Sequence, residues 1–220
     1  MARRLAGILP ILGVVAFVGL YFCAAWAYSA GNTIDPAHNG YDHLHNFWCE
    51  LYNELTHSGE RNLGRPWALV SAPILTGTAF FFWFAITSQF REFRRLCRVV
   101  WLTGPAAMLA AAFISTPAHD VVITVAVPLG IAALVATCVG LARKRRWLLV
   151  ALAVLATAMS SLDYGLWKME LLKPAQAVIQ KLAIALVLSW ILISSLTVIS
   201  EVTRRPRGLK SDISLDEYKL

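Results

Sequence analysis

Long apolar stretches separated by short polar segments dominate this sequence. Each of six stretches approaches or exceeds the roughly 20 residues that an α-helix needs to cross the hydrocarbon core of a membrane. None of them alternates apolar and polar residues as a membrane β-strand does, and a spanning helix satisfies its own backbone hydrogen bonds. The pattern therefore predicts an all-α polytopic membrane bundle with six transmembrane helices, at Leu5–Ala30, Trp67–Phe90, Val99–Thr116, Val121–Ala142, Trp147–Leu166 and Ala175–Ser200.

The connection between the first two predicted spans, residues 31–66, is the longest polar segment between spans. Within Asp42–His57 apolar residues recur at helical spacing, and Asp42 is a suitable residue for a helix start. We expect this stretch to form an extracytoplasmic amphipathic helix that lies on the membrane surface or folds over the bundle. Its polar stripe is compatible with two roles: it lines the wall of a pocket, or it is a face of the helix that contacts water. The apolar face would contain Leu44, Phe47, Trp48, Leu51 and Leu55, and the polar stripe His43, Glu50, Glu54 and His57.

Composition agrees with a membrane protein and excludes several other classes. Of the 220 residues, 58% are hydrophobic and 15% are charged, whereas soluble domains average about 45–50% apolar and about 25% charged residues. Disordered chains, disulfide scaffolds and most soluble folds are therefore excluded. We expect one six-helix transmembrane domain, residues 1–203, which includes the extracytoplasmic loop 31–66, followed by a cytoplasmic tail, residues 204–220.

The basic residues indicate how the chain is oriented. If six helices alternate across the membrane, 15 of the 20 Lys and Arg residues fall on the side that holds both termini. The positive-inside rule then places both termini in the cytoplasm. The net charge of +7 divides into about +10 inside and about −3 outside, so it reflects topology and contact with anionic lipids. The basic runs are short and lack interleaved aromatic residues, and we therefore expect no nucleic-acid binding.

Most of the side chains that could carry chemistry fall on the outer side of this map. All five histidines are external, as are eight of the 13 acidic residues. A reaction centre or binding site should therefore face outward. The candidates for catalytic groups are Glu50, Glu54, His119, Asp120 and Asp163.

His119 and Asp120 lie at the connection between the third and fourth predicted spans. Thr116 and Pro117 are typical of a helix start, where the helix dipole favours an acid such as Asp120. The same His–Asp pair suits general-base catalysis, because an adjacent carboxylate orients an imidazole. Both interpretations remain open.

The outer side also offers ligands for a divalent metal such as zinc or iron. Glu54 and His57 stand one helical turn apart, as carboxylate and imidazole ligands do in di-metal bundles, but no second helix repeats the pair. A complete site therefore needs residues from another connection. The expected metal ligands are His57, His119 and Asp120.

Two ionisable residues lie inside predicted spans. Asp163 is about one turn deep in the fifth span and Lys181 about two turns deep in the sixth, so antiparallel neighbours bring them to a similar depth. Ionisable groups inside a membrane are candidates for function by default. We expect Asp163 and Lys181 to pair in the outer leaflet, either in a functional site or as a structural ion pair.

One stretch of the outer loop resembles a known group of proteins. His45-Asn46-Phe47-Trp48-Cys49-Glu50-Leu51, followed by Asn62 and Arg65-Pro66, resembles uncharacterised bacterial six-span membrane proteins in which an H-N-aromatic-W-C-acid-L motif precedes N-x-x-R-P. The hydropathy layout is also similar to the FGF-receptor-activating-gene/DRAM/Sfk type. This resemblance implies the fold and a bacterial inner-membrane location, but no established activity. We take His45, Asn46, Asn62, Arg65 and Lys181 as candidates for substrate binding.

A more distant resemblance is to the alkaline ceramidase/adiponectin-receptor type of membrane hydrolase. Those proteins hold zinc with Ser-x-x-x-His, an Asp and a late His-x-x-x-His. Ser115 and His119 match the first element, whereas no histidine follows His119 and Pro117 interrupts the helix that would align the pair. The resemblance implies a zinc-dependent hydrolase.

Two functions fit these observations, and the sequence does not decide whether the protein is an enzyme. The first is a hydrolase or group transferase that acts on a lipid or lipid-linked substrate at the outer leaflet. The second is a lipid-binding protein, a sensor or an accessory subunit of a membrane complex. A transporter fits less well, because no inverted repeat is evident. Membrane lipids are the expected partners, and a homo-oligomer or a membrane-complex partner is compatible with both.

Overall fold

The computed structural model describes residues 2–113, 119–169, 171 and 173–204, with side chains for all of these except residues 2–4, 119, 120, 123, 173, 174, 202 and 204. Within this part of the chain no β-strand forms, and only two isolated bridges connect extended segments. The predicted all-α fold is confirmed. The elements are α1 (Ala2–Trp26), η1 (Trp48–Tyr52), α2 (Arg65–Ile86), η2 (Thr87–Phe90), α3 (Arg94–Ala111), α4 (His119–Arg143), α5 (Trp147–Lys168) and α6 (Lys173–Arg204).

Five of these helices are long and apolar enough to cross a membrane. The stretches concerned are Leu5–Trp26, Arg65–Phe90, Thr124–Arg143, Trp147–Lys168 and Ala175–Glu201. The helix α3 does not reach the same hydropathy, because Arg94, Arg95 and Arg98 occupy its first turns. Large apolar side chains such as Leu102 and Ile131 remain exposed on the helices, as contact with lipid tails requires. These features are those of a multi-pass membrane protein.

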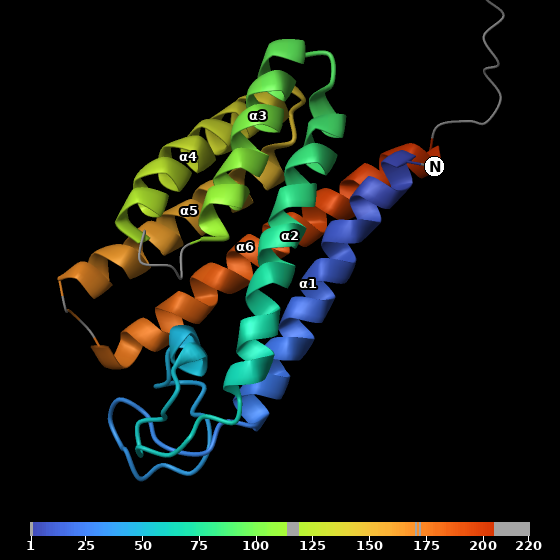
Figure 1. Cartoon of the computed structure of the whole chain (residues 1–220). Coiled ribbons are helices and arrows are strands. Elements are labelled where there is room, and N and C mark those ends of the chain that lie inside the picture. Colours follow the sequence, from blue (N-terminus) through green and yellow to red (C-terminus); the bar gives the residue numbers. More distant parts are fainter. Residues whose placement is uncertain (1, 114–118, 170, 172, 205–220) are drawn as a thin grey trace, which may run out of the picture.

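The helices pack mainly as neighbours along the chain. Extensive contacts join α1 with α2, α3 with α4 and α5 with α6, and α6 also packs on α1 (Figure 1). The N-terminal end of α1 lies beside the C-terminal end of α6 (Figure 1). At that end of the bundle, Lys144 pairs with Glu92 at 2.6 Å and Arg146 pairs with Glu201. The two ends of the helical domain therefore lie on the same side.

Aromatic side chains and small residues build the core between the helices. Phe17 of α1 and Phe82 of α2 are 2% and 1% exposed, and the rings of Phe82 and Trp190 meet edge to face with centroids 4.9 Å apart. A Cβ atom on Gly104 would lie 2.4 Å from the Trp83 ring. The close approach of α3 to α2 therefore requires glycine at this position, as is common between membrane helices.

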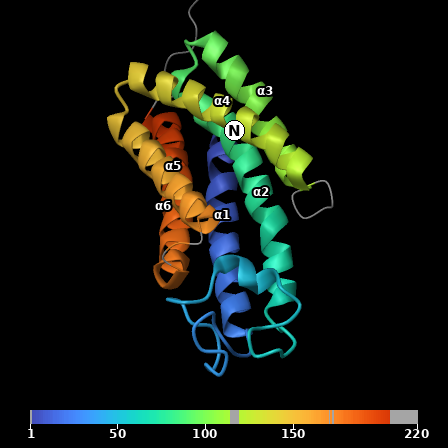
Figure 2. The same ribbon diagram turned by 90° about the vertical axis from the view of Figure 1, so that its left-hand side faces the viewer.

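The segment between α1 and α2, residues 27–64, folds over the ends of these two helices and reaches the start of α6. We call this segment the cap. Figure 2 shows it at the end of the bundle opposite the top of α3 and α4. Its short helix η1 packs against α2 and α6.

The cap does not contain the amphipathic helix that the sequence predicted over Asp42–His57. Only η1, five residues long, is helical in this stretch. The Leu44 N–H donates to Asp42 Oδ1 at 2.8 Å, and the Asp42 N–H donates to Asn46 Oδ1 at 2.8 Å. Such bonds from side chains to the local backbone compete with the helical pattern, and the prediction from apolar spacing did not weigh them.

Candidate functional site

Asn46 lies at the centre of the cap and is fully buried. Its Nδ2 donates to the Gly31 carbonyl at 3.0 Å and to Glu50 Oε2 at 2.7 Å, while its Oδ1 accepts the Asp42 N–H. One amide side chain thus joins three segments of the cap. Gly31 has φ +88°, and a Cβ there would lie 2.7 Å from the Ser58 nitrogen, so the turn that meets Asn46 requires glycine.

Glu50 is the buried acid of the cap, with 6% of its surface exposed. Besides the bond from Asn46, its Oε1 lies 2.9 Å from His57 Nε2. The His57 side chain is 32% exposed, and the Glu50 side chain is 8% exposed. The pair therefore consists of a buried carboxylate that orients a partly solvent-accessible imidazole.

Asn62 closes the cap onto the start of α2. Its Nδ2 lies within 3.3 Å of three carbonyl oxygens, and its Oδ1 accepts the Gly64 N–H at 2.9 Å. The three carbonyls belong to Glu50, Leu51 and Asn53. Asn62 is 3% exposed, so its polar atoms serve the fold of the cap.

Contacts with α1 and α6 dock the cap on the bundle. The Trp48 N–H donates to Gln180 Oε1 at 2.7 Å, and the Trp48 ring stacks on Tyr21 and Phe17 with centroids 3.9 and 5.1 Å apart. Lys181 Nζ donates to the Asn46 carbonyl and lies 5.6 Å from the centroid of the Tyr41 ring. The apolar core thus continues from the helices into the cap.

Tyr41 completes the interior of the cap. Its hydroxyl donates to the Phe47 carbonyl at 3.2 Å. Burial raises the pKa of Tyr41 above its ordinary value, and the nearby Tyr21 and Glu50 act in the same direction. Tyr28 behaves similarly, because burial also raises its pKa. Both phenols therefore remain neutral hydrogen-bonding groups.

Asp163 and Lys181 do not form the ion pair that the sequence predicted. No salt bridge joins them in the described part of the chain, since Lys181 Nζ bonds to the carbonyls of Asn46 and Ala177. Asp163 instead lines a separate cavity between the cap, α5 and α6. The prediction considered only two neighbouring helices and could not include the cap carbonyl that attracts the lysine.

The other predicted site residues fall into two groups within the described residues. Four cap residues and Lys181 of α6 belong to one continuous network; the cap residues are Asn46, Glu50, His57 and Asn62. Glu54 lies outside it, with its side chain 77% exposed and paired with Arg65 at 3.1 Å. His45 pairs with Asp42 and not with Glu50, since its Nδ1 lies 2.6 Å from Asp42 Oδ2. The two acids of the predicted stripe are therefore separated.

The predicted metal site involves side chains outside the described set. His119 and Asp120 belong to the first turn of α4, but their side chains are among those not described. Among the residues that the structure does describe, no group of three His, Cys, Asp or Glu side chains is close enough to hold a metal ion. The predicted metal site at His57, His119 and Asp120 stays a prediction.

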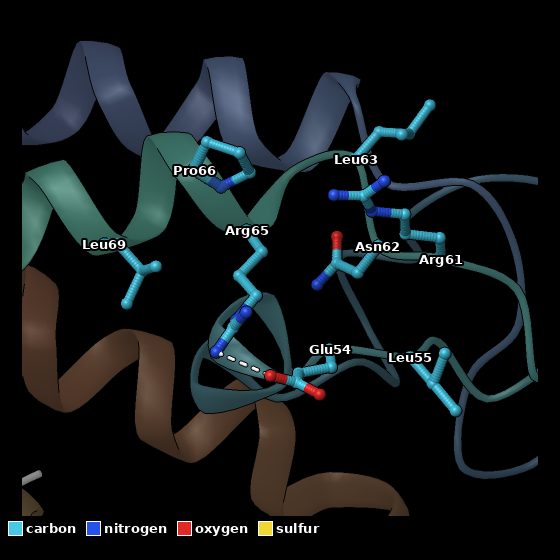
Figure 3. Close-up of a pocket in the computed structure, with 8 residues that line it drawn as sticks. All are labelled: Glu54, Leu55, Arg61, Asn62, Leu63, Arg65, Pro66 and Leu69. Carbon is cyan, nitrogen blue, oxygen red and sulfur yellow. Dashed lines mark ion pairs between the residues drawn. The ribbon is translucent and has the colours of Figure 1, made fainter.

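An open cavity of about 550 Å³ lies where the cap joins α2 (Figure 3). Arg65 pairs with Glu54 on one side, and Figure 3 shows the Arg61 guanidinium turned away from that pair. Within the described residues the Arg61 guanidinium has no ion pair. Three leucines line the same cavity and are at least half exposed: Leu55, Leu63 and Leu69.

Sequence reasoning did not single out Arg61, Tyr41 or the docking role of Trp48. The sequence analysis placed Trp48 on the apolar face of the predicted helix, and the structure packs its partly buried ring on Tyr21 and Phe17. The sequence signal for this docking role was the position of Trp48 in the motif between Asn46 and Glu50, two polar residues that the structure buries. Comparisons of the chain with protein-family models, with curated proteins and with solved structures found no match.

Proposed function

We propose that this chain is an inner-membrane protein of bacteria that binds a lipid or lipid-linked molecule with an anionic headgroup at the outer leaflet. The proposal includes six spans and cytoplasmic termini. Two observations favour this topology: α3 packs along α4 as a hairpin, and the ends of α1 and α6 lie together. The Arg-rich connections near Glu92 and Arg146 lie at that same end, as the positive-inside rule requires of the cytoplasmic side.

The cavity between the cap and α2 is the observation that carries the binding proposal. Arginine recognises phosphate through its planar set of donors, and Arg61 and Arg65 both line this cavity. The exposed Leu55, Leu63 and Leu69 beside them suit acyl chains. A phospholipid presents these two chemistries next to each other at the membrane surface.

The interior of the cap supports binding more than catalysis. Each carboxylate oxygen of Glu50 already has a partner, and the polar atoms of Asn46 and Asn62 bond to the cap itself. These groups make the cap rigid without leaving a reactive pair beside the cavity. We therefore favour a lipid-binding or accessory role.

Lipid binding by purified protein tests the proposal. In a native mass-spectrometry titration with phosphatidylglycerol, we expect the double variant R61Q/R65Q to lose at least about tenfold in affinity. The matched control is Lys168→Gln, which removes one exposed cation on the same side of the bundle. Equal binding by the double variant and the control would refute the anionic site.

The Glu50–His57 pair favours one second function, a hydrolase or transferase acting on an outer-leaflet lipid. With Nε2 on the carboxylate at 2.9 Å, the imidazole retains Nδ1 as a base, an arrangement used in general-base catalysis. The same purified protein should then convert extracted bacterial lipids. His57→Gln should abolish conversion and preserve phosphatidylglycerol binding, with His38→Gln as the control; absence of turnover by the wild type would exclude this function.

A further inference from the structure

A second cavity, of about 400 Å³, lies between the cap and the adjacent ends of α5 and α6. This volume is in the range of small-ligand sites. The cap contributes Phe47 and Cys49, α5 contributes Asp163, Tyr164 and Trp167, and α6 contributes Gln176 and Gln180. The cavity is separate from the arginine-lined one, with which it shares no lining residue.

Asp163 is the one charged residue in this lining. Its Oδ1 is buried and has no hydrogen-bond partner in the described part of the chain. A buried carboxylate oxygen without a partner is costly, and it is satisfied when a ligand brings a donor. Lys181, which follows Gln180 on α6, bonds to the cap carbonyl of Asn46 and lies over Tyr41, so it does not serve Asp163.

Three aromatic side chains line the same cavity as Asp163. Tyr164 and Trp167 are 63% and 61% exposed, their ring centroids lie 6.0 Å apart, and the cap contributes Phe47 to the lining. Aromatic faces attract organic cations, and a carboxylate in the same cavity offers an ammonium group a charge-assisted hydrogen bond. An anionic headgroup would find no cation in this lining and would be repelled by Asp163.

We infer that this cavity binds an organic ammonium group, with Asp163 as its counter-ion and with Tyr164 and Trp167 as its aromatic walls. Gln176, which is 4% exposed, and Gln180 supply neutral amides around it. The cavity lies at the ends of two membrane helices, at the level where exposed Trp and Tyr residues mark the membrane surface. The ammonium source that fits this position is the headgroup of a zwitterionic lipid; a free amine offers the same chemistry.

Competition between lipids tests the site in the full-length protein. Native mass spectrometry in detergent would compare phosphatidylethanolamine, phosphatidylcholine and phosphatidylglycerol, with free ethanolamine as the soluble probe. We expect Asp163→Asn to lose at least tenfold in affinity for phosphatidylethanolamine and to keep its affinity for phosphatidylglycerol. Trp167→Leu should weaken the binding of both zwitterionic lipids. The control is Glu60→Gln, which removes an exposed acid from the cap.

Each outcome decides a separate point. Unchanged phosphatidylethanolamine binding in both Asp163→Asn and Trp167→Leu overturns the ammonium site, whereas the arginine-lined cavity is judged by R61Q/R65Q alone. Displacement of the lipid by millimolar ethanolamine assigns the site to free amines, and no displacement assigns it to the lipid. If Asp163→Asn does not fold, Trp167→Leu decides the question, because Trp167 is largely exposed and its loss leaves the core unchanged.

Discussion

At the scale of single residues, Asn46 holds most of the cap together. Its removal leaves Glu50 Oε2, the Gly31 carbonyl and the Asp42 N–H without their shared partner. Loss of one partner from a buried polar group costs about 1–3 kcal/mol. We expect Asn46→Ala to lower the free energy of unfolding by about 2–3 kcal/mol in thermal denaturation, whereas the exposed Asn39→Ala should have little effect. Equal melting of the two variants would contradict this role.

Asp42 makes the cap sensitive to acid. Burial disfavours its charge, but hydrogen bonds from His45 and from the Leu44 N–H outweigh burial, and the pKa of Asp42 lies below its ordinary value. The ionised carboxylate therefore stabilises the folded cap above about pH 3.9, and this contribution is lost as the pH falls through the lowered pKa. The protection of cap amides against hydrogen exchange, taken relative to the intrinsic rate at each pH, should fall over that acidic range in the wild type. Asp42→Asn should exchange faster at pH 6 and show a weaker pH dependence; parallel profiles would exclude this role.

Sequence analysis identified many residues of the hydrogen-bonded network in the cap, but not the groups to which they bond. Asn46, Glu50, Asn62 and Lys181 were all candidates from their position in a polar motif or inside a span, and the structure joins them in one network. The partners are backbone carbonyls of an irregular loop, and residue spacing carries no information about those. Asp163 was also a candidate, yet its cavity depends on how the cap meets α5 and α6.

At the scale of elements, the helices followed from apolar run length, whereas the cap did not follow from apolar spacing. Each predicted span overlaps a helix, and five of these helices are long and apolar enough to cross a membrane, because the bilayer imposes a length and a hydropathy that are visible in sequence. The segment Asp42–His57 shows the opposite case. Of its apolar residues, Leu51 is buried and Trp48 packs on the helices, whereas Leu44 and Leu55 are 60% and 59% exposed. Side-chain bonds to the local backbone set the conformation of this segment.

Trp48 and Trp26 differ in how they are packed, so replacing each of them by alanine tests how the cap docks. Trp48 stacks on Tyr21 and Phe17, whereas Trp26, at the end of α1, is 92% exposed. Truncation of a buried aromatic residue costs about 3–5 kcal/mol, and the low end of this range applies to Trp48, which is partly buried against the core. Trp48→Ala should therefore lower stability by about 3 kcal/mol and open the cap to trypsin at Arg61, while Trp26→Ala should do neither. Identical digestion of the two variants would refute docking through Trp48.

At the scale of the whole molecule, the proposed topology places the cap on the outer side of the inner membrane. In a variant without the four native cysteines, a thiol introduced as Glu60→Cys should react with a membrane-impermeant reagent in intact cells. A thiol introduced as Arg94→Cys, at the start of α3, should react only after the membrane is opened. Both side chains are exposed in the structure, so accessibility within the protein is matched. The reverse pattern would invert the topology and remove the outer-leaflet proposal.

The bond between the Trp48 N–H and Gln180 joins residues 132 positions apart. A membrane protein is inserted while the ribosome is still translating, so early segments emerge before late ones. The cap emerges with the first two helices, while its docking partners on α6 have not yet been synthesised. Docking of the cap is therefore a late event in biogenesis, because it can occur only after α6 has been synthesised. A nascent chain arrested before α6 should carry a protease-sensitive cap, which becomes protected once Gln180 and Lys181 are added.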